Sequence, residues 1–153
     1  MEQSTSSKKL EAAVGNHPFL KNLSPRHLQT LTDSAMQLEF EPNQIIFREG
    51  DMANRFYLIE SGKVALETSA KGEESKLIQT IGAGDVLGWS WLFPPYYWQF
   101  DARALEPTKA IFFYGTRLRE QCEQDSDLGY ELMKRMSEII IQRLQATRKQ
   151  LLA

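Results

Sequence analysis

Glycines that separate short apolar runs restrict the fold of this chain more than any other feature. Gly50, Gly62, Gly84 and Gly88 each stand where an apolar run ends, and tight turns at such places need the positive φ that glycine adopts freely. Several of the runs alternate apolar with charged residues, as half-buried strands do. The pattern predicts about eight short strands and therefore a mainly β fold, a β-roll or sandwich.

Helices are expected on both sides of the strands. Ser24 and Pro25 have the residue types of an N-cap and a first helical position. Asp125 or Ser126 can cap a long helix that runs to about Leu151. Its apolar face contains Met133, Met136, Ile140, Leu144, Thr147 and Leu151, widened by Ile139 and Ile141. This face is wide enough to pack on its own domain and on a second copy, which predicts a homodimer through the helix.

The length of 153 residues suits one domain with a single core. Residues 1–16 are expected to form a flexible tail or a short docking helix. Residues 17–35 are assigned to helices, 36–114 to the β-roll and 115–153 to the C-terminal helices. Within the roll, Ser61-Gly62 is interpreted as a hairpin turn, 69–75 as a polar loop tip and Pro107 as the turn between the last two strands.

The composition argues against several classes of function. A net charge of −2 gives no overall attraction to nucleic acid or anionic membranes. The single cysteine, Cys122, can form no disulfide within the chain and cannot hold an iron–sulfur cluster, and His17 and His27 lack neighbours at metal-ligand spacing. No nucleophile–base set is apparent, so an enzyme is not expected. Without a signal sequence or a membrane-length apolar run, a cytoplasmic location is expected.

Three motifs in order carry a family resemblance: FREGD at 47–51, FYLIESGKVAL at 56–66 and GAGDVLG at 82–88. Together they resemble the cyclic nucleotide-binding domain, the sensory module of catabolite-activator-type regulators, kinase regulatory subunits and gated channels. The resemblance covers about residues 17–150. It implies an eight-stranded β-roll of the jelly-roll kind that holds a small ligand and reports its presence through the C-terminal helix.

The same resemblance implies a short helix after Gly88 whose N–H groups face a cyclic phosphate. In the family this helix begins Gly-Glu, the glutamate binds the ribose hydroxyl, and an arginine about ten residues later pairs with the phosphate. Here Trp89 stands at the glutamate position, and the arginine position falls near Trp98 or Gln99. An indole accepts no hydrogen bond, and neither of the latter two neutralises a phosphate. Binding of a cyclic nucleotide is therefore expected to be weak or lost.

Three interpretations of GWSWLFPPYYW, residues 88–98, remain open. The aromatic side chains fill the pocket themselves, they line a remodelled pocket for a small apolar or anionic ligand, or the altered segment still binds a cyclic nucleotide. The candidate ligand contacts are Gly88, Trp89, Ser90, Trp91, Leu92, Tyr97, Trp98, Gln99 and Phe100. Thr147 joins them because RLQATR, residues 143–148, resembles the helix segment that reaches the adenine in the catabolite activator.

Charged residues are given structural roles. Arg103 matches a strand arginine of the family and is expected to pair with Asp101. Arg143 and the other basic residues of the last helix are expected on a solvated or interfacial face, mixed with glutamates. No helix-turn-helix follows RKQLLA, so direct DNA binding is not expected. The function predicted is a stand-alone sensor of a small ligand, with no cofactor. The alternative is a ligand-free interaction and dimerisation module.

Overall fold

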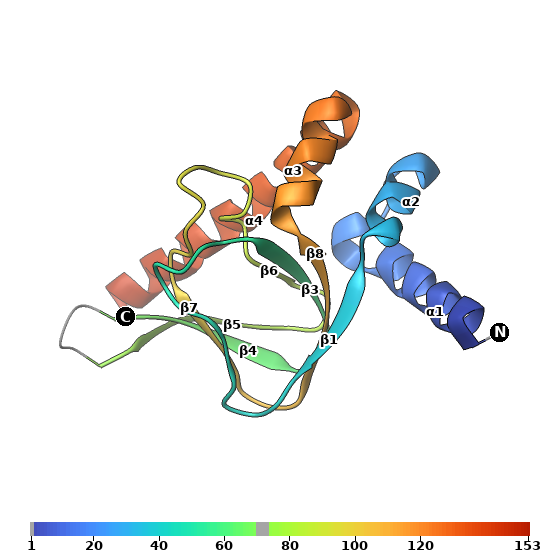
Figure 1. Cartoon of the computed structure of the whole chain (residues 1–153). Coiled ribbons are helices and arrows are strands. Elements are labelled where there is room, and N and C mark those ends of the chain that lie inside the picture. Colours follow the sequence, from blue (N-terminus) through green and yellow to red (C-terminus); the bar gives the residue numbers. More distant parts are fainter. Residues whose placement is uncertain (1, 70–73) are drawn as a thin grey trace.

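The structure is a computed structural model that describes residues 2–69 and 74–153, with side chains from residue 8 onward. Three helices precede the strands and two follow them (Figure 1). The first group is α1 (Glu2–Asn16), the 3-10 helix η1 (Pro18–Leu20) and α2 (Pro25–Asp33). The strands are β1 (Met36–Phe40), β2 (Ile45–Phe47), β3 (Arg55–Ser61), β4 (Lys63–Thr68), β5 (Lys76–Gly82), β6 (Val86–Leu87), β7 (Asp101–Ala104) and β8 (Thr108–Tyr114). The last helices are α3 (Gly115–Gln124) and α4 (Ser126–Leu152).

The strands form two antiparallel sheets, ordered β1-β8-β3-β6 and β2-β7-β4-β5. This is the eight-stranded β-roll that the glycine pattern predicts, so the predicted fold class is confirmed. α4 runs along the β5 side of the roll, and α1 and α2 lie at the opposite end (Figure 1). The predicted loop tip at 69–75 lies partly outside the described residues, because 70–73 are not among them.

The prediction of a hairpin at Ser61-Gly62 is wrong. β3 and β4 belong to different sheets, so the chain turns a corner between the sheets at Gly62. β7 and β8 also belong to different sheets, and the two corners touch. A Cβ on Gly62 would lie 2.6 Å from Cα of Thr108 and 2.7 Å from the carbonyl oxygen of Pro107. Only glycine, with φ +103°, fits this crossing.

Apolar side chains form two clusters. One lies between the β3–β8 sheet and the helices and contains Phe19, Leu31, Phe56, Trp91, Phe113, Leu118 and Leu132. The other fills the interior of the roll and contains Phe40, Phe47, Tyr57, Leu66, Trp98, Phe100 and Phe112. The segment after Gly88 contributes to both clusters, because Trp91 packs in the first and Trp98 in the second. It therefore links the helices to the interior of the roll.

The N-terminal helices are tied to the roll. Val14 of α1 is completely buried, and Leu10 packs beside it, so residues 8–16 form a docked helix, which was one of the two expectations, and not a flexible tail. His17 caps η1 by accepting from the Phe19 amide through Nδ1, and its Nε2 lies 3.1 Å from the Ile59 carbonyl oxygen. Ser24 caps α2 as predicted. Within the described residues, no helix is both long and apolar enough to cross a membrane.

The buried face of α4 differs from the predicted one. Asp125 caps the helix, and the buried residues are Leu128, Leu132, Met136 and Arg143. Leu144 and Leu151, assigned to the apolar face by their spacing, are 68% and 82% exposed. Apolar residues recur at helical spacing on two different faces of α4. The face that packs on the roll is the one that includes Arg143, and the face with Leu144 and Leu151 is exposed.

Candidate functional site

The segment from Gly88 to Phe100 forms turns and not the short helix that the resemblance implies. A single turn closes where the Leu92 amide donates to the Trp89 carbonyl, and a second where the Tyr96 amide donates to that of Phe93. Pro94 and Pro95 are the two central residues of the second turn, and neither has the N–H that a helix requires. A row of helix N-terminal donors for an anion is therefore absent from this segment, whose residues are all described.

Trp98, one of the two residues near the expected arginine position, occupies the interior of the roll. Its indole stacks on Phe47 with ring centroids 3.7 Å apart and an interplanar angle of 6°, and only 4% of the residue is exposed. The far edge of the ring covers Gly88, where a Cβ would lie 2.6 Å from two ring atoms. Gly88 has φ +99°, so both its backbone and the indole require a glycine there.

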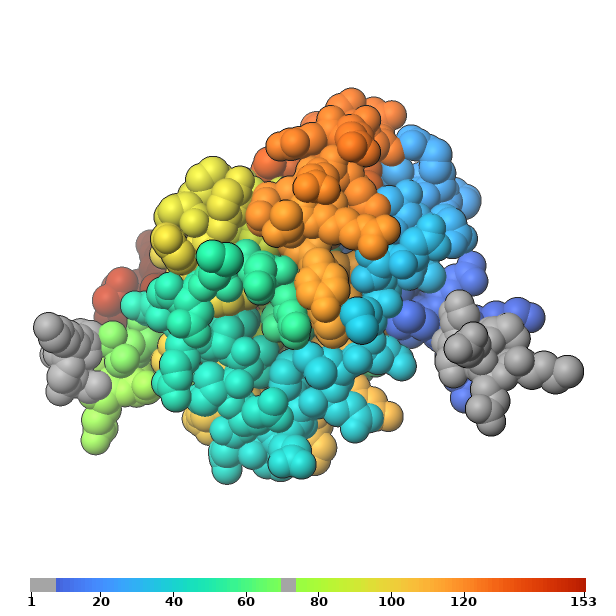
Figure 2. Space-filling model, viewed as in Figure 1, coloured from blue at the N-terminus to red at the C-terminus, as the bar shows by residue number. Residues whose placement is uncertain are grey.

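The backbone of Trp98 is held as firmly as its ring. Its amide donates to the Asp51 carbonyl and its carbonyl accepts from the Gly50 amide, both at 2.9 Å. These bonds connect the segment to the FREGD turn, which the sequence reasoning treated as a separate motif. The segment's tip lies at the surface, beside that turn and α3 (Figure 2). Displacing the indole from the roll therefore requires side-chain rotation, while the main chain stays bonded.

The other candidate contacts are not brought together around one pocket. Phe100 lies beside Phe47 in the interior cluster, but Trp91 stacks on Phe56 in the other cluster. Trp89 packs against both clusters. Leu92 is half-buried, while Tyr97 and Gln99 are exposed. Gln99 donates to the Tyr97 carbonyl, and Thr147 is exposed and donates to the Arg143 carbonyl within α4. Gly50, Gly62 and Gly84 stand at turns with positive φ.

Three buried donors of the segment lack a hydrogen-bond partner among the described residues. They are Nε1 of Trp89, Oγ of Ser90 and Nε1 of Trp91. Unpaired buried polar groups cost about 1–3 kcal/mol each. The interior of the roll is thus well packed at Trp98 and Phe47, but the turn that leads to it is not fully satisfied.

The prediction that Arg103 pairs with Asp101 is wrong. Arg103 donates from Nε to Glu67 at 2.9 Å and from a terminal nitrogen to Asn43 at 3.1 Å. Asp101 instead accepts from the Glu49 amide at 2.7 Å. Alternate residues of a strand share a face, but cross-strand neighbours lie closer than residues two apart. The side chains of both residues therefore bond to other parts of the roll.

Arg143 was missed as a candidate and assigned to a solvated face. It is 7% exposed, and its two terminal nitrogens each donate at 2.7 Å, one to Oε1 of Gln79 in β5 and one to the Val86 carbonyl in β6. The signal in the sequence is its position, since it continues the buried stripe of Leu128, Leu132 and Met136. Burial lowers the pKa of Arg143 to about 10, against a smaller raising effect of Asp85.

A second arginine ties α3 to the tip of the segment. Arg119 donates to the Trp91 carbonyl, and its guanidinium lies 4.0 Å from the centroid of the Tyr96 ring. Arg143 bonds to Val86, two residues before this segment, so the last two helices both contact the chain on the N-terminal side of Trp98. A shift of this part of the chain would therefore change its contacts with Arg119 of α3 and Arg143 of α4.

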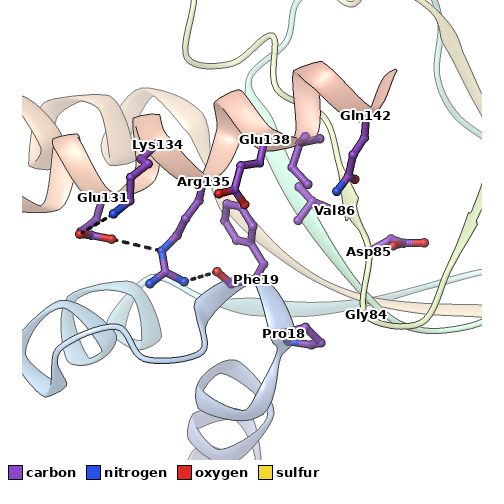
Figure 3. Close-up of a pocket in the computed structure, with 11 residues that line it drawn as sticks. Pro18, Phe19, Gly84, Asp85, Val86, Glu131, Lys134, Arg135, Glu138 and Gln142 are labelled. Carbon is purple, nitrogen blue, oxygen red and sulfur yellow. Dashed lines mark hydrogen bonds and ion pairs between the residues drawn. The ribbon is translucent and has the colours of Figure 1, made fainter. Parts of the chain in front are cut away.

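A groove of about 370 Å³ lies between η1, the β5–β6 turn and α4 (Figure 3). At one end, Glu131 pairs with Lys134 and Arg135, and Arg135 also donates to the Phe19 carbonyl. Asp85 and Glu138 line the same groove. Within the described residues, no group of three or more histidines, cysteines or carboxylates could hold a metal ion.

The sequence was compared with models of known protein families. The model of the cyclic nucleotide-binding domain matches residues 37–125, more than half of the chain. This chain belongs to that family. The match spans β1 to the start of α4 and includes the whole segment that holds Trp98. The family is one of regulatory and sensor domains and not of catalysts.

Individual relatives agree with this assignment. The chain is 30% identical over 78 residues to the cAMP-dependent protein kinase regulatory subunit of Schizosaccharomyces pombe, which is 51% of this chain and 18% of that protein. It is 23% identical over 133 residues to the CRP-like cAMP-activated global transcriptional regulator of Mycobacterium tuberculosis, 87% of this chain and 58% of that protein. The chain thus spans less than two thirds of these curated relatives.

Among solved structures, a putative cyclic nucleotide-binding protein from Geobacter metallireducens GS-15 is similar over almost its whole length. It is 27% identical with a TM-score of 0.77, and the match covers 91% of this chain and 98% of that one. The helices on both sides of the roll are therefore shared with a chain of similar extent.

Proposed function

We propose that this chain is a regulatory domain of the cyclic nucleotide-binding family in which Trp98 takes the place of the ligand. A small molecule changes the state of the domain by displacing the indole from the roll, and α4 transmits this conformational change. The observation that carries the proposal is the stack of Trp98 on Phe47 over Gly88. Because the indole fills the roll at the family's arginine position, a cyclic phosphate has neither the space nor the charge partner that the family provides.

Two arginine contacts support transmission through the helices. Arg143 of α4 donates to Val86, which precedes Gly88 by two residues, and Arg119 of α3 donates to Trp91. A ligand shifts an equilibrium only by binding two states with different affinity. Here the two states are the indole inside the roll and the indole outside it, and both arginine contacts lie within the chain that leads to Trp98.

A homodimer through α4 is also part of the proposal. Ile141, Leu144, Leu151 and Leu152 are between 53% and 82% exposed. Ile141, Leu144 and Leu151 follow one another at spacings of three and seven residues, which fit the heptad pattern by which two helices pair. A dimer would give the helix a partner against which to move.

Thermal unfolding with millimolar cyclic AMP and cyclic GMP tests the proposal. A ligand that binds only the native state raises the midpoint by mass action. We expect no shift for the native chain, because each missing charge-assisted contact is worth roughly 1.5–3 kcal/mol. The double variant Trp89→Glu, Trp98→Arg restores both family residues and should gain a shift with cyclic AMP. A rise in the native chain would refute the claim that Trp98 excludes the nucleotide.

Displacement is tested with Trp98→Ala and free indole as the probe. The variant should bind indole in the emptied space, and its unfolding midpoint should rise with indole concentration. Its self-association, measured by sedimentation with and without indole, should differ if α4 reports occupancy. Equal association constants would show that the helix does not respond.

The ligand-free interaction module remains the alternative. It also explains a filled roll, but the comparisons do not favour it, since the relatives are regulators named for cyclic nucleotides. The indole experiment separates the two, because an interaction module gives no helix response to occupancy.

A further inference from the structure

Arg143 is a buried cation whose hydrogen-bond partners are both neutral. The carbonyl of Val86 and the side-chain oxygen of Gln79 accept from its terminal nitrogens, while Nε has no partner among the described residues. Among those residues, no carboxylate oxygen lies within 4.0 Å of the guanidinium. Buried charges in proteins are normally paired or bound to an ion, so this guanidinium has capacity for an anion.

Gln79 separates the guanidinium from an open groove of about 450 Å³ between β5 and α4. The groove is lined by the hydrogen-bonding side chains Gln79, Thr80, Gln142, Gln145 and Gln150, by Lys149, and by the apolar Leu77, Ile78 and Ala146. Arg143 is not itself part of the lining. A ligand in the groove would therefore reach it by taking the place of the Gln79 amide oxygen.

The charge of this groove has one sign. Lys149 is the only ionisable residue of its described lining, and Arg143 lies behind Gln79. The groove in Figure 3, on the other side of Val86, has charges of both signs: Asp85, Glu131 and Glu138 are acidic, and Lys134 and Arg135 are basic. An anion would therefore be attracted more strongly to the β5 groove, where the charge of the described lining is basic alone. Amide and hydroxyl donors beside a cation are groups that bind carboxylate or phosphate oxygens.

We propose that the groove between β5 and α4 is a binding site for a small oxyanion, a carboxylate or a phosphate, which pairs with Arg143 after displacing the Gln79 oxygen and is also held by Lys149. The site is separate from the interior position of Trp98. Its occupancy would replace the Arg143–Gln79 contact between α4 and β5, while the bond from Arg143 to Val86 of β6 stays in place. The proposal does not depend on displacement of the indole.

Inorganic phosphate and succinate are the probes, each titrated against sodium chloride of equal ionic strength. The unfolding midpoint of the native chain should rise saturably, by about 3–6 °C at a tenfold excess over the dissociation constant. Arg143→Met should abolish the saturable rise, and Lys149→Gln should weaken the binding. A response to phosphate alone identifies phosphates as the ligand class, and a response to both probes identifies oxyanions in general.

Gln79→Glu gives a matched test that leaves Arg143 in place. The new carboxylate has the same shape and pairs with the guanidinium internally, so the midpoint without anions should rise and the response to phosphate should disappear. Arg119→Gln, which changes a guanidinium away from the groove, should keep the response.

Three results would overturn the proposal. They are no saturable response in the native chain, an equal response in Arg143→Met, and a full response in Gln79→Glu. If Arg143→Met does not fold, the Gln79→Glu and Lys149→Gln variants still decide the question. Failure here leaves the midpoints with cyclic nucleotides and indole unaffected, so it is distinguishable from failure of the proposed function.

Discussion

Replacing Trp98 by alanine should remove more stability than any other change in the segment after Gly88, apart from Trp91. The side chain is buried, and a large aromatic residue replaced by alanine in a core costs about 3–5 kcal/mol. The stack on Phe47 is included in this figure, since aromatic pairs add about 0.5–1.5 kcal/mol to the burial of their area. For a chain of this length, each kcal/mol lowers the unfolding midpoint by about 2–4 °C. The midpoint should therefore fall by about 6–20 °C.

Circular dichroism at 222 nm is the suitable assay, because the substitution removes one of the fluorophores. Gln99→Ala is the matched control, since the neighbouring side chain is exposed and surface changes usually stay within about 0.5 kcal/mol. A loss below about 1 kcal/mol in Trp98→Ala would mean that the indole does not fill the roll. In that case the argument that it replaces a ligand would fail with it.

Four further predictions follow from other parts of the structure. Gly62→Ala should lower the free energy of unfolding, measured in urea, by about 2–5 kcal/mol, because its Cβ meets the backbone of the other corner and its φ is positive. Gly15→Ala is the control, and it should be neutral or stabilising because the space at its Cβ is open. Leu144→Glu should convert the expected dimer to a monomer in sedimentation without lowering the monomer's stability, and an unchanged mass would refute pairing through this face. Burial lowers the pKa of His17 below its ordinary value of 6.5, although its contacts to the Ile59 carbonyl and Asp85 oppose this effect. Because the unfolded chain then binds the proton more readily, the free energy of unfolding should fall as the pH drops below about 6.5. His17→Gln should flatten that pH dependence. Burial raises the pKa of Cys122 to about 11, so about one thiol in a thousand is ionised at pH 8, and iodoacetamide should label the folded chain far more slowly than the unfolded one.

Local signals in the sequence predicted the elements but not the sheets to which they belong. The strands and the Ser24 cap depend on residues next to one another, and the structure has both. Whether β4 pairs with β3 or crosses to the other sheet depends on contacts with Pro107 and Thr108, far along the chain. A glycine between two strands is compatible with either geometry, so the hairpin prediction had no means of excluding a corner.

The candidate site shows the same division. Trp89 at the expected glutamate position, and the lack of an arginine at Trp98 or Gln99, predicted a changed phosphate site, and this prediction required only the motif. That the indole stacks on Phe47 required the fold, because the two residues belong to different motifs. Arg143 was missed because charge was given more weight than periodicity. Its position, about four turns after Leu128 on the same helix face, is visible in the sequence, but an arginine is normally expected to be exposed to solvent.

The stack of Trp98 on Phe47 also has a consequence for how strongly any free molecule must bind. A side chain tethered beside its own pocket acts as a competitor whose effective concentration is on the order of millimolar or above. An aromatic molecule with the same intrinsic affinity as the indole would have to exceed that concentration to occupy half of the protein. A weakly held metabolite at micromolar level would leave the domain in its tryptophan-filled state. The tether thus sets a threshold, so that only a tight binder or an abundant one changes the state of the domain.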